Sequence, residues 1–242
     1  MALPSFTMPT YTVDIPSMDK TVRFRPFVVK EEKALLLAQQ SDDPVTMIET
    51  LKNVIKTCVQ DKIDVEKLAT FDLEYLFTQI RAKSVGETVD LFVKCSQDSC
   101  RDNPKAQMKI SFDITTLKIE KDPEHTNRFN LFGDVGVVMK YPNIDTLSKI
   151  STLDPRSGDV DIMFSIMADC IDYIFEGDEI YYASEQSRAE LETFVGNLTS
   201  DQFIALQKFL TTMPKLSKEI EFTCPECGTN SSRKLEGITS FF

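Results

Sequence analysis

The chain has 242 residues, of which 42% are hydrophobic and 27% are charged, so it can bury a substantial core as one large domain or two small ones. This composition argues against extensive disorder. The formal net charge of −11 disfavours binding to a phosphate backbone, because nucleic-acid affinity depends largely on Lys and Arg. We therefore expect protein partners and no nucleic acid.

The amino-terminal stretch MALPSFTMPT lacks the basic region and the long apolar region of a secretion signal. No apolar run approaches the roughly 18 residues that a membrane-spanning helix needs. We expect a soluble, intracellular protein without a membrane partner. In a reducing compartment, its six cysteines are more often free thiols or metal ligands than disulfides.

The first third of the chain predicts a hairpin followed by helices. Apolar residues alternate on both sides of an SMDK turn, at Val13, Ile15, Val22 and Phe24, and KEEKALLLAQQ begins a short helix. Asp43 can cap a second helix that starts at Pro44, and its apolar stripe includes Cys58, which is expected in the core. A third helix ends at Gly86.

Strand patterns follow. ETVDLFVKC and AQMKISFDITTL alternate apolar and polar residues, which predicts a β-hairpin with Cys95 and Cys100 at its tip. FGDVGVVMKYP predicts a further strand. From about Ile144 to Pro214 the pattern is helical, and an apolar stripe through Cys170, Ile171 and Ile174 predicts one buried helix.

Two capping boxes mark the next two helix starts, at Ser187 with Glu190 and at Thr199 with Gln202. After Pro214 the tail returns to β structure and forms a second hairpin around a CPECG turn, with Cys224, Cys227 and Gly228.

Four cysteines therefore lie at two predicted hairpin tips. Zinc prefers four tetrahedral sulfur or nitrogen ligands, and a two-residue spacing followed by Gly lets both sulfurs of Cys224 and Cys227 reach one ion. Cys95 and Cys100 are more widely spaced but close enough to join them. We predict a structural Zn²⁺ site from Cys95, Cys100, Cys224 and Cys227. The alternatives are unrelated thiols, one disulfide, or a redox pair, which would need a helix after its first Cys.

No residue pattern supports an enzyme, and we expect no catalytic activity. His125 is the single histidine, and we expect it on the surface in a polar loop. No Gly-rich phosphate loop is present, and acidic pairs such as Asp154 with Asp159 are expected as caps and solvated loops. Nearby Lys94, Arg101, Arg233 and Lys234 either offset the charge of four thiolates or form ordinary surface.

These patterns predict an α+β fold with a zinc-ribbon-like module of β-hairpins and an inserted, mainly helical part. Residues 1–86 are assigned to an N-terminal hairpin plus helices. Residues 87–143 and 215–242 are assigned to the split zinc-ribbon-like module, and residues 144–214 to the helical insertion.

Three segments carry a resemblance to a known family: KLATFDLEYLFTQIRAKSVGE, FLTTMPKLSKEIEFTCPECG and the ending LEGITSFF. From about Tyr11 onward the chain resembles the baseplate hub proteins of T-even-type phages, which include hub subunits and hub assembly factors. The resemblance covers the Cys224 and Cys227 pair and the turn from Arg81 to Gly86, but the wider first cysteine pair departs from it.

The resemblance implies a protein made in the host cytoplasm during infection, which acts in hub assembly as a component of the virion tail baseplate or as a transient helper. It implies phage hub or tail partners and no catalytic residues. We expect Phe241 and Phe242 to fold back on the ribbon or to contact a partner. The alternatives are a zinc-ribbon nucleic-acid-binding or transcription factor, which the charge disfavours, and an enzyme with an unrecognised site.

Overall fold

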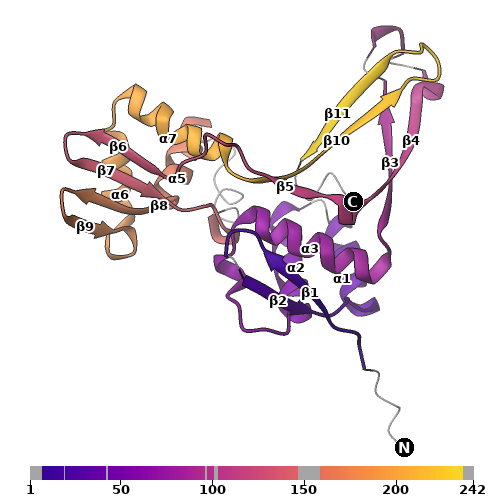
Figure 1. The fold of residues 1–242 in the computed structure, drawn as a ribbon, viewed down its shortest axis with the longest axis horizontal. Helices are drawn as coiled ribbons and strands as arrows, with labels where there is room; N and C mark the ends of the chain where they lie inside the picture. Colours follow the sequence, from indigo (N-terminus) through magenta and orange to yellow (C-terminus); the bar gives the residue numbers. More distant parts are fainter. Residues whose placement is uncertain are drawn as a thin grey trace, which may run out of the picture.

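The computed structural model describes residues 7–18, 20–41, 43–95, 97–100, 103–146 and 159–236. Within these ranges the protein is an α+β structure whose sheets are small and antiparallel, as expected. Figure 1 shows three parts along the molecule: an N-terminal unit, a projecting arm and a lobe. None of the helices in the described part of the chain combines the length and the apolar character that a bilayer crossing requires.

The N-terminal unit is a hairpin packed against helices. Val13 lies opposite Val22 in the antiparallel pair of strands, which confirms the predicted hairpin. Their apolar faces and those of the helices form one core that includes Ile15, Leu76 and Phe77. The elements are β1 (Tyr11–Ile15), β2 (Lys20–Phe24), α1 (Val29–Gln40), α2 (Pro44–Cys58), the short 3-10 helix η1 (Val65–Lys67) and α3 (Thr70–Val85).

Local signals set the helix ends in this unit. The carboxylate of Asp43 accepts hydrogen bonds from the amides of Val45 and Thr46 at the start of α2, which confirms the predicted cap. Cys58 ends α2 fully buried in the core, also as expected. Gly86 follows α3 with a φ of 119°, a conformation that side-chain-bearing residues rarely adopt.

The arm consists of two hairpins, and both predicted hairpins are confirmed. Val89 lies opposite Phe112 in the first, and Phe222 lies opposite Ser231 in the second. Apolar side chains of both hairpins belong to one cluster with Ala82 of α3, so the arm is rooted on the N-terminal unit (Figure 1). The strands are β3 (Thr88–Lys94), β4 (Gln107–Asp113), β10 (Lys215–Thr223) and β11 (Asn230–Glu236), and β5 (Lys118–Glu120) pairs with the start of β10.

The lobe packs helices against an antiparallel sheet with the order β6-β7-β8-β9. Its core contains Val137, Met167, Leu206 and Phe209. Both predicted capping boxes are present. The elements are β6 (Arg128–Phe132), β7 (Val135–Met139), α5 (Asp159–Asp169), β8 (Ile171–Glu176), β9 (Glu179–Tyr182), α6 (Arg188–Gly196) and α7 (Ser200–Thr212).

The prediction of one helix through Ile171 and Ile174 is wrong. The helix α5 ends at Asp169, and the apolar residues beyond it form β8, which pairs with β7 on one side and β9 on the other. Ile171 and Phe175 are both buried and lie four residues apart. This spacing places two residues on one face of a helix and also on one face of a strand, so the apolar stripe did not distinguish the two structures. Cys170 is fully buried as expected, but at the junction of the two elements.

This sheet joins residues from both sides of the boundary predicted between residues 143 and 144. Strands β6 and β7 come from the segment assigned to the ribbon module, yet they pair with each other and with β8 in the lobe. The inserted part therefore contains strands as well as helices. Residues 154, 241 and 242, for which the sequence raised expectations, lie outside the described ranges.

Candidate metal centre

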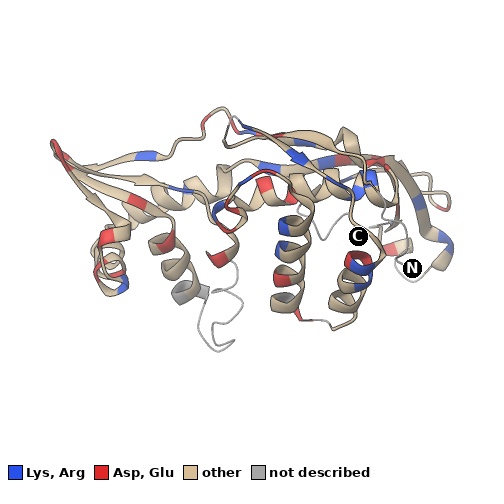
Figure 2. Ribbon diagram, turned by 90° about the horizontal axis from the view of Figure 1, so that it is seen from below, with Lys and Arg blue, Asp and Glu red and all other residues tan. Residues whose placement is uncertain are grey.

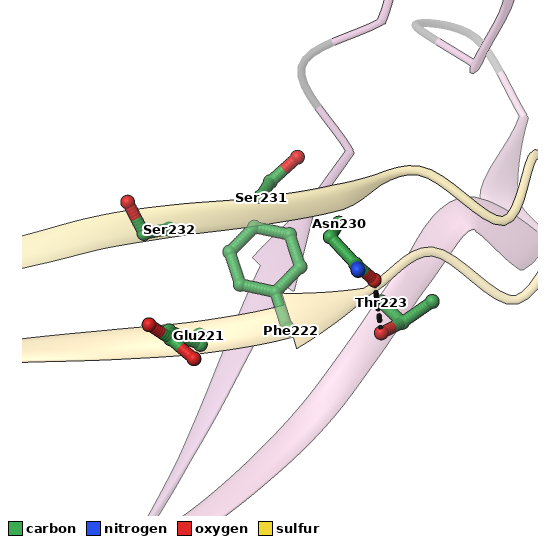
Figure 3. Close-up of a pocket in the computed structure, with 6 residues that line it drawn as sticks. All are labelled: Glu221, Phe222, Thr223, Asn230, Ser231 and Ser232. Carbon is green, nitrogen blue, oxygen red and sulfur yellow. Dashed lines mark hydrogen bonds between the residues drawn. The ribbon is translucent and has the colours of Figure 1, made fainter.

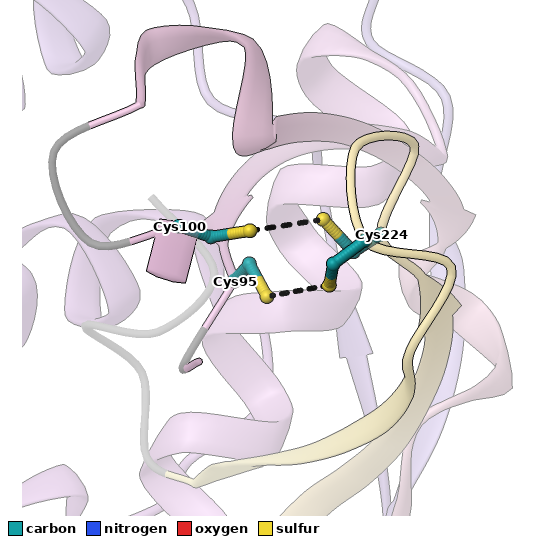
Figure 4. A group of neighbouring side chains, drawn as sticks. Cys95, Cys100 and Cys224 are labelled. Carbon is teal, nitrogen blue, oxygen red and sulfur yellow. Dashed lines mark hydrogen bonds between the residues drawn. The ribbon is translucent and has the colours of Figure 1, made fainter. Parts of the chain in front are cut away.

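The four predicted metal ligands converge at the tip of the arm. The Sγ atoms of Cys95, Cys100, Cys224 and Cys227 all lie within 4.8 Å of one another. Cys95 Sγ is 3.8 Å from Cys227 Sγ, and Cys100 Sγ is 4.0 Å from Cys224 Sγ. Figure 4 shows that the sulfurs point toward one another from two separate loops. No other group with metal-ligand geometry is found among the described residues.

In the first loop, a short turn compensates for the wide spacing of the two cysteines. The amide of Cys95 donates to the carbonyl of Ala106 (3.0 Å), which continues the pairing of β3 with β4. The amide of Cys100 donates to the carbonyl of Gln97 (2.9 Å) in the 3-10 turn η2 (Asp98–Cys100). This turn brings the second sulfur back toward the first, so four intervening residues still allow convergence.

The second loop is a tight turn. The amide of Cys224 donates to the carbonyl of Thr229 (3.0 Å), and the amide of Gly228 donates to the carbonyl of Cys224 (2.9 Å). Gly228 has a φ of 68°, which favours glycine at this position. The side-chain amide of Asn103 donates to a carboxylate oxygen of Glu226 (3.1 Å) and so links the two loops. The sequence interpretation missed this link, because only the fold brings Asn103 and Glu226 together.

The sulfur distances fit a metal site and not a disulfide. A disulfide has an S–S distance of about 2.05 Å, and all six cysteines are free thiols. Two zinc–sulfur bonds of about 2.3 Å at a tetrahedral angle place their sulfurs about 3.8 Å apart. The observed sulfur–sulfur distances of 3.8 and 4.0 Å are close to this value. Cys95, Cys100 and Cys224 are 6%, 5% and 1% exposed, so solvent reaches mainly Cys227.

The pKa values of these thiols differ. A hydrogen bond with the hydroxyl of Thr229, 3.3 Å from Cys227 Sγ, lowers the pKa of Cys227 to about 6. Burial raises the pKa of Cys100 to about 12. Of these two thiols, Cys227 therefore loses its proton more readily than Cys100. Binding of a divalent ion to four thiolates releases the remaining protons, so metal affinity rises with pH.

The basic residues considered as charge partners are spread over the arm surface. Lys94 and Arg233 are exposed. Lys234 Nζ lies 3.5 Å from a carboxylate oxygen of Glu120, so this cation pairs with β5. Arg101 lies outside the described residues.

The expectation of a surface position for His125 holds only in part. Its ring is half-buried and stacks on Tyr141 and Phe209. Its Nδ1 lies 2.9 Å from Thr212 Oγ1, and its Nε2 lies 3.0 Å from the hydroxyl of Tyr141. Burial lowers the pKa of His125. The sequence around it is polar, so only the tertiary structure reveals the aromatic neighbours.

A shallow groove of about 540 Å³ lies on the second hairpin of the arm (Figure 3). Thr223 Oγ1 donates to Asn230 Oδ1 (2.7 Å), so these two polar side chains of the groove are paired with each other. In Figure 3 the ring of Phe222 lies between Thr223 and Asn230 on one side and Glu221 and Ser232 on the other. The lining residues are Glu221, Phe222, Thr223, Asn230, Ser231 and Ser232.

Comparison with known protein families matches residues 8–242 to the model of the T4 bacteriophage base plate protein family. The chain belongs to this family. A search of curated proteins and a search of solved structures each give no match. Membership confirms the resemblance to T4-type phage baseplate proteins and identifies the chain as a component of the phage tail baseplate. Its partners are accordingly other baseplate or tail proteins.

Proposed function

We propose that this baseplate protein is a hub subunit or a hub assembly factor, made in the host cytoplasm during infection, that acts through protein–protein contacts. The observation that carries the proposal is the family match over residues 8–242, together with the hub-like segments at residues 67–87, 209–228 and 235–242. The architecture supports it, because a projecting arm rooted on a folded unit suits contacts with neighbouring subunits (Figure 1).

We further propose that the four cysteines hold one structural zinc ion. Four protein thiolates complete a tetrahedral zinc shell and leave no position for water or substrate. The ion would join the tips of two hairpins that are far apart in sequence, and so hold the arm in one shape. A baseplate subunit needs such a fixed shape if the arm is to meet a partner in one orientation, because flexible segments lose entropy on binding.

The arm presents groups suited to such a contact. Phe92 lies on the outer face of β3 and is exposed. The groove beside Phe222 lies on the other hairpin. Aromatic side chains on a rigid element are frequent anchors of protein interfaces.

We propose no catalytic activity. The interactions of His125 support this view, because both of its ring nitrogens lie within hydrogen-bonding distance of Thr212 and Tyr141. A general base must reach a substrate proton, and here the imidazole nitrogens already have partners.

Copurification from infected cells tests the proposal. An affinity-tagged chain should bring down baseplate hub proteins from assembly intermediates, and mass spectrometry of mature tails should then distinguish the two hub roles. Presence in mature tails identifies a hub subunit, and presence only in intermediates identifies an assembly factor. Association with peripheral baseplate proteins alone, without hub proteins, would refute the hub assignment.

A further inference from the structure

The strand β9 (Glu179–Tyr182) forms one edge of the sheet in the lobe. It pairs with β8 and stands last in the order β6-β7-β8-β9. All four of its residues are exposed, and Ile180, Tyr181 and Tyr182 are 49%, 39% and 48% exposed. Edge strands of soluble proteins usually carry Lys, Pro or a bulge that prevents pairing with other chains. The strand EIYY has neither Lys nor Pro, and its pairing with β8 is regular.

Two residues of β9 point their backbone groups away from β8. Glu179 lies opposite Glu176 across the two-residue turn of Gly177 and Asp178. The pair that closes a two-residue hairpin turn is of the hydrogen-bonded kind. Because the two kinds of pair alternate along an antiparallel ladder, Tyr181 also bonds toward β8. The N–H and C=O groups of Ile180 and Tyr182 therefore face outward, where an added strand can pair with them.

The edge is held in shape by its own side chains. The rings of Tyr173 and Tyr182 stack edge-on across the strands with centroids 5.9 Å apart. The hydroxyl of Tyr181 donates to a carboxylate oxygen of Glu179 (2.6 Å). Because this edge is already ordered before a partner binds, binding has a smaller entropy cost.

Charge narrows the choice of partner. The segment 171–187 contains five acidic residues and no Lys or Arg: Asp172, Glu176, Asp178, Glu179 and Glu185. Figure 2 shows acidic residues at the outer end of the lobe. A second copy of the chain would bring the same acidic residues to this edge, and like charges on facing strands are destabilising. A segment rich in Lys or Arg is complementary instead.

We propose that the β9 edge binds an extended, basic segment of another baseplate polypeptide, which adds one strand to the sheet. Backbone hydrogen bonds to Ile180 and Tyr182 supply the pairing, and Lys or Arg side chains meet the acidic residues. This inference deepens the proposed function, and it rests on that function only for the identity of the partner as a baseplate protein.

The test uses the full chain and two blocked heptapeptides as probes. One alternates Lys with Val and Tyr, and the other has Glu in place of Lys. Binding is followed by titration, and amide hydrogen exchange locates the site. We expect the basic peptide to bind in a salt-sensitive way and to slow exchange at Ile180 and Tyr182, whereas the acidic peptide does not bind.

Three variants identify the edge as the site. Ile180→Pro removes an outward N–H without touching the ladder to β8, and edge strands tolerate Pro at such positions. We expect it to weaken binding about tenfold, since it leaves a partner carbonyl unpaired. Ile180→Lys should weaken binding of the basic peptide, because it places a positive charge at the edge. Ile204→Lys is the matched control, because Ile204 is an exposed isoleucine on α7 of the same lobe, and it should leave binding unchanged.

The proposal is overturned if the basic peptide does not bind, if it protects amides elsewhere, or if Ile180→Pro binds it as tightly as the original chain. Self-association that Ile180→Pro abolishes would also overturn it in favour of a second copy. These outcomes differ from failure of the proposed function. If the proposed function is wrong, the unmodified chain does not copurify with hub proteins. Peptide binding can persist in that case.

Discussion

Replacement of Cys224 by Ser is expected to remove the zinc ion that we propose at the four cysteines and to loosen the arm. Cys224 is 1% exposed, and its sulfur is 4.0 Å from that of Cys100. The variant keeps the size of the side chain but replaces a thiolate ligand with a hydroxyl, which is a poor zinc ligand at neutral pH. The second loop would then hold zinc only through the exposed Cys227.

The size of the effect follows from the loop that the metal closes. Cys100 and Cys224 are separated by 124 positions in the chain. Cross-linking a loop of this length removes denatured-state entropy worth about 5 kcal/mol at 25 °C, and the length-dependent part alone is about 4 kcal/mol. We therefore expect the free energy of unfolding at saturating zinc to fall by up to about 5 kcal/mol. The loss should concentrate in the arm, because all four proposed ligands lie there.

The assay combines zinc content, thermal unfolding and hydrogen exchange. We expect one zinc per chain in the original protein and much less in Cys224→Ser, with faster amide exchange in β3, β4, β10 and β11. Cys58→Ser is the matched control, because Cys58 is buried in the N-terminal core and far from the cluster in the fold. A buried hydroxyl destabilises that core by about 1–3 kcal/mol, but zinc content should stay at one per chain.

One result would refute the reasoning directly. If Cys224→Ser retains one zinc per chain and the exchange protection of β10 and β11, the four sulfurs do not form the site. Absence of zinc from the original protein, purified under reducing conditions with zinc supplied, would have the same consequence.

Two further predictions concern the N-terminal unit and the lobe. Asp72 is fully buried, and burial raises its pKa although hydrogen bonds from Ser17 oppose the shift. Because its folded pKa lies above the unfolded value near 4, stability is lost as pH rises through the folded pKa. Asp72→Asn should flatten this part of the Tm–pH profile, and an unchanged profile would contradict the assignment. Gly136→Ala should destabilise the lobe by about 2 kcal/mol in a denaturant titration, because the new Cβ overlaps the ring of Phe175 and the carbonyl of Phe129; an unchanged midpoint would argue against this packing.

The sequence alone determined those helices and strands whose local residue pattern fits only one kind of secondary structure. Alternation around the SMDK turn specified the first hairpin, and Asp43 followed by Pro44 specified the start of α2. The strand-like runs before each cysteine pair placed all four cysteines at hairpin tips. These features depend on neighbours within a few residues, so sequence alone was sufficient for them.

Tertiary structure decided what the local patterns left open. The run from Ile171 to Ile174 fits a helix stripe and a buried strand equally well, and pairing with β7 made it a strand. The polar loop around His125 gave no sign of the stack with Tyr141 and Phe209. The sequence also supplied two cysteine pairs, but only the packing of the two hairpins brings their sulfurs within 4.8 Å. Contacts between distant segments depend on which apolar faces bury one another, and periodicity within a single segment does not contain that information.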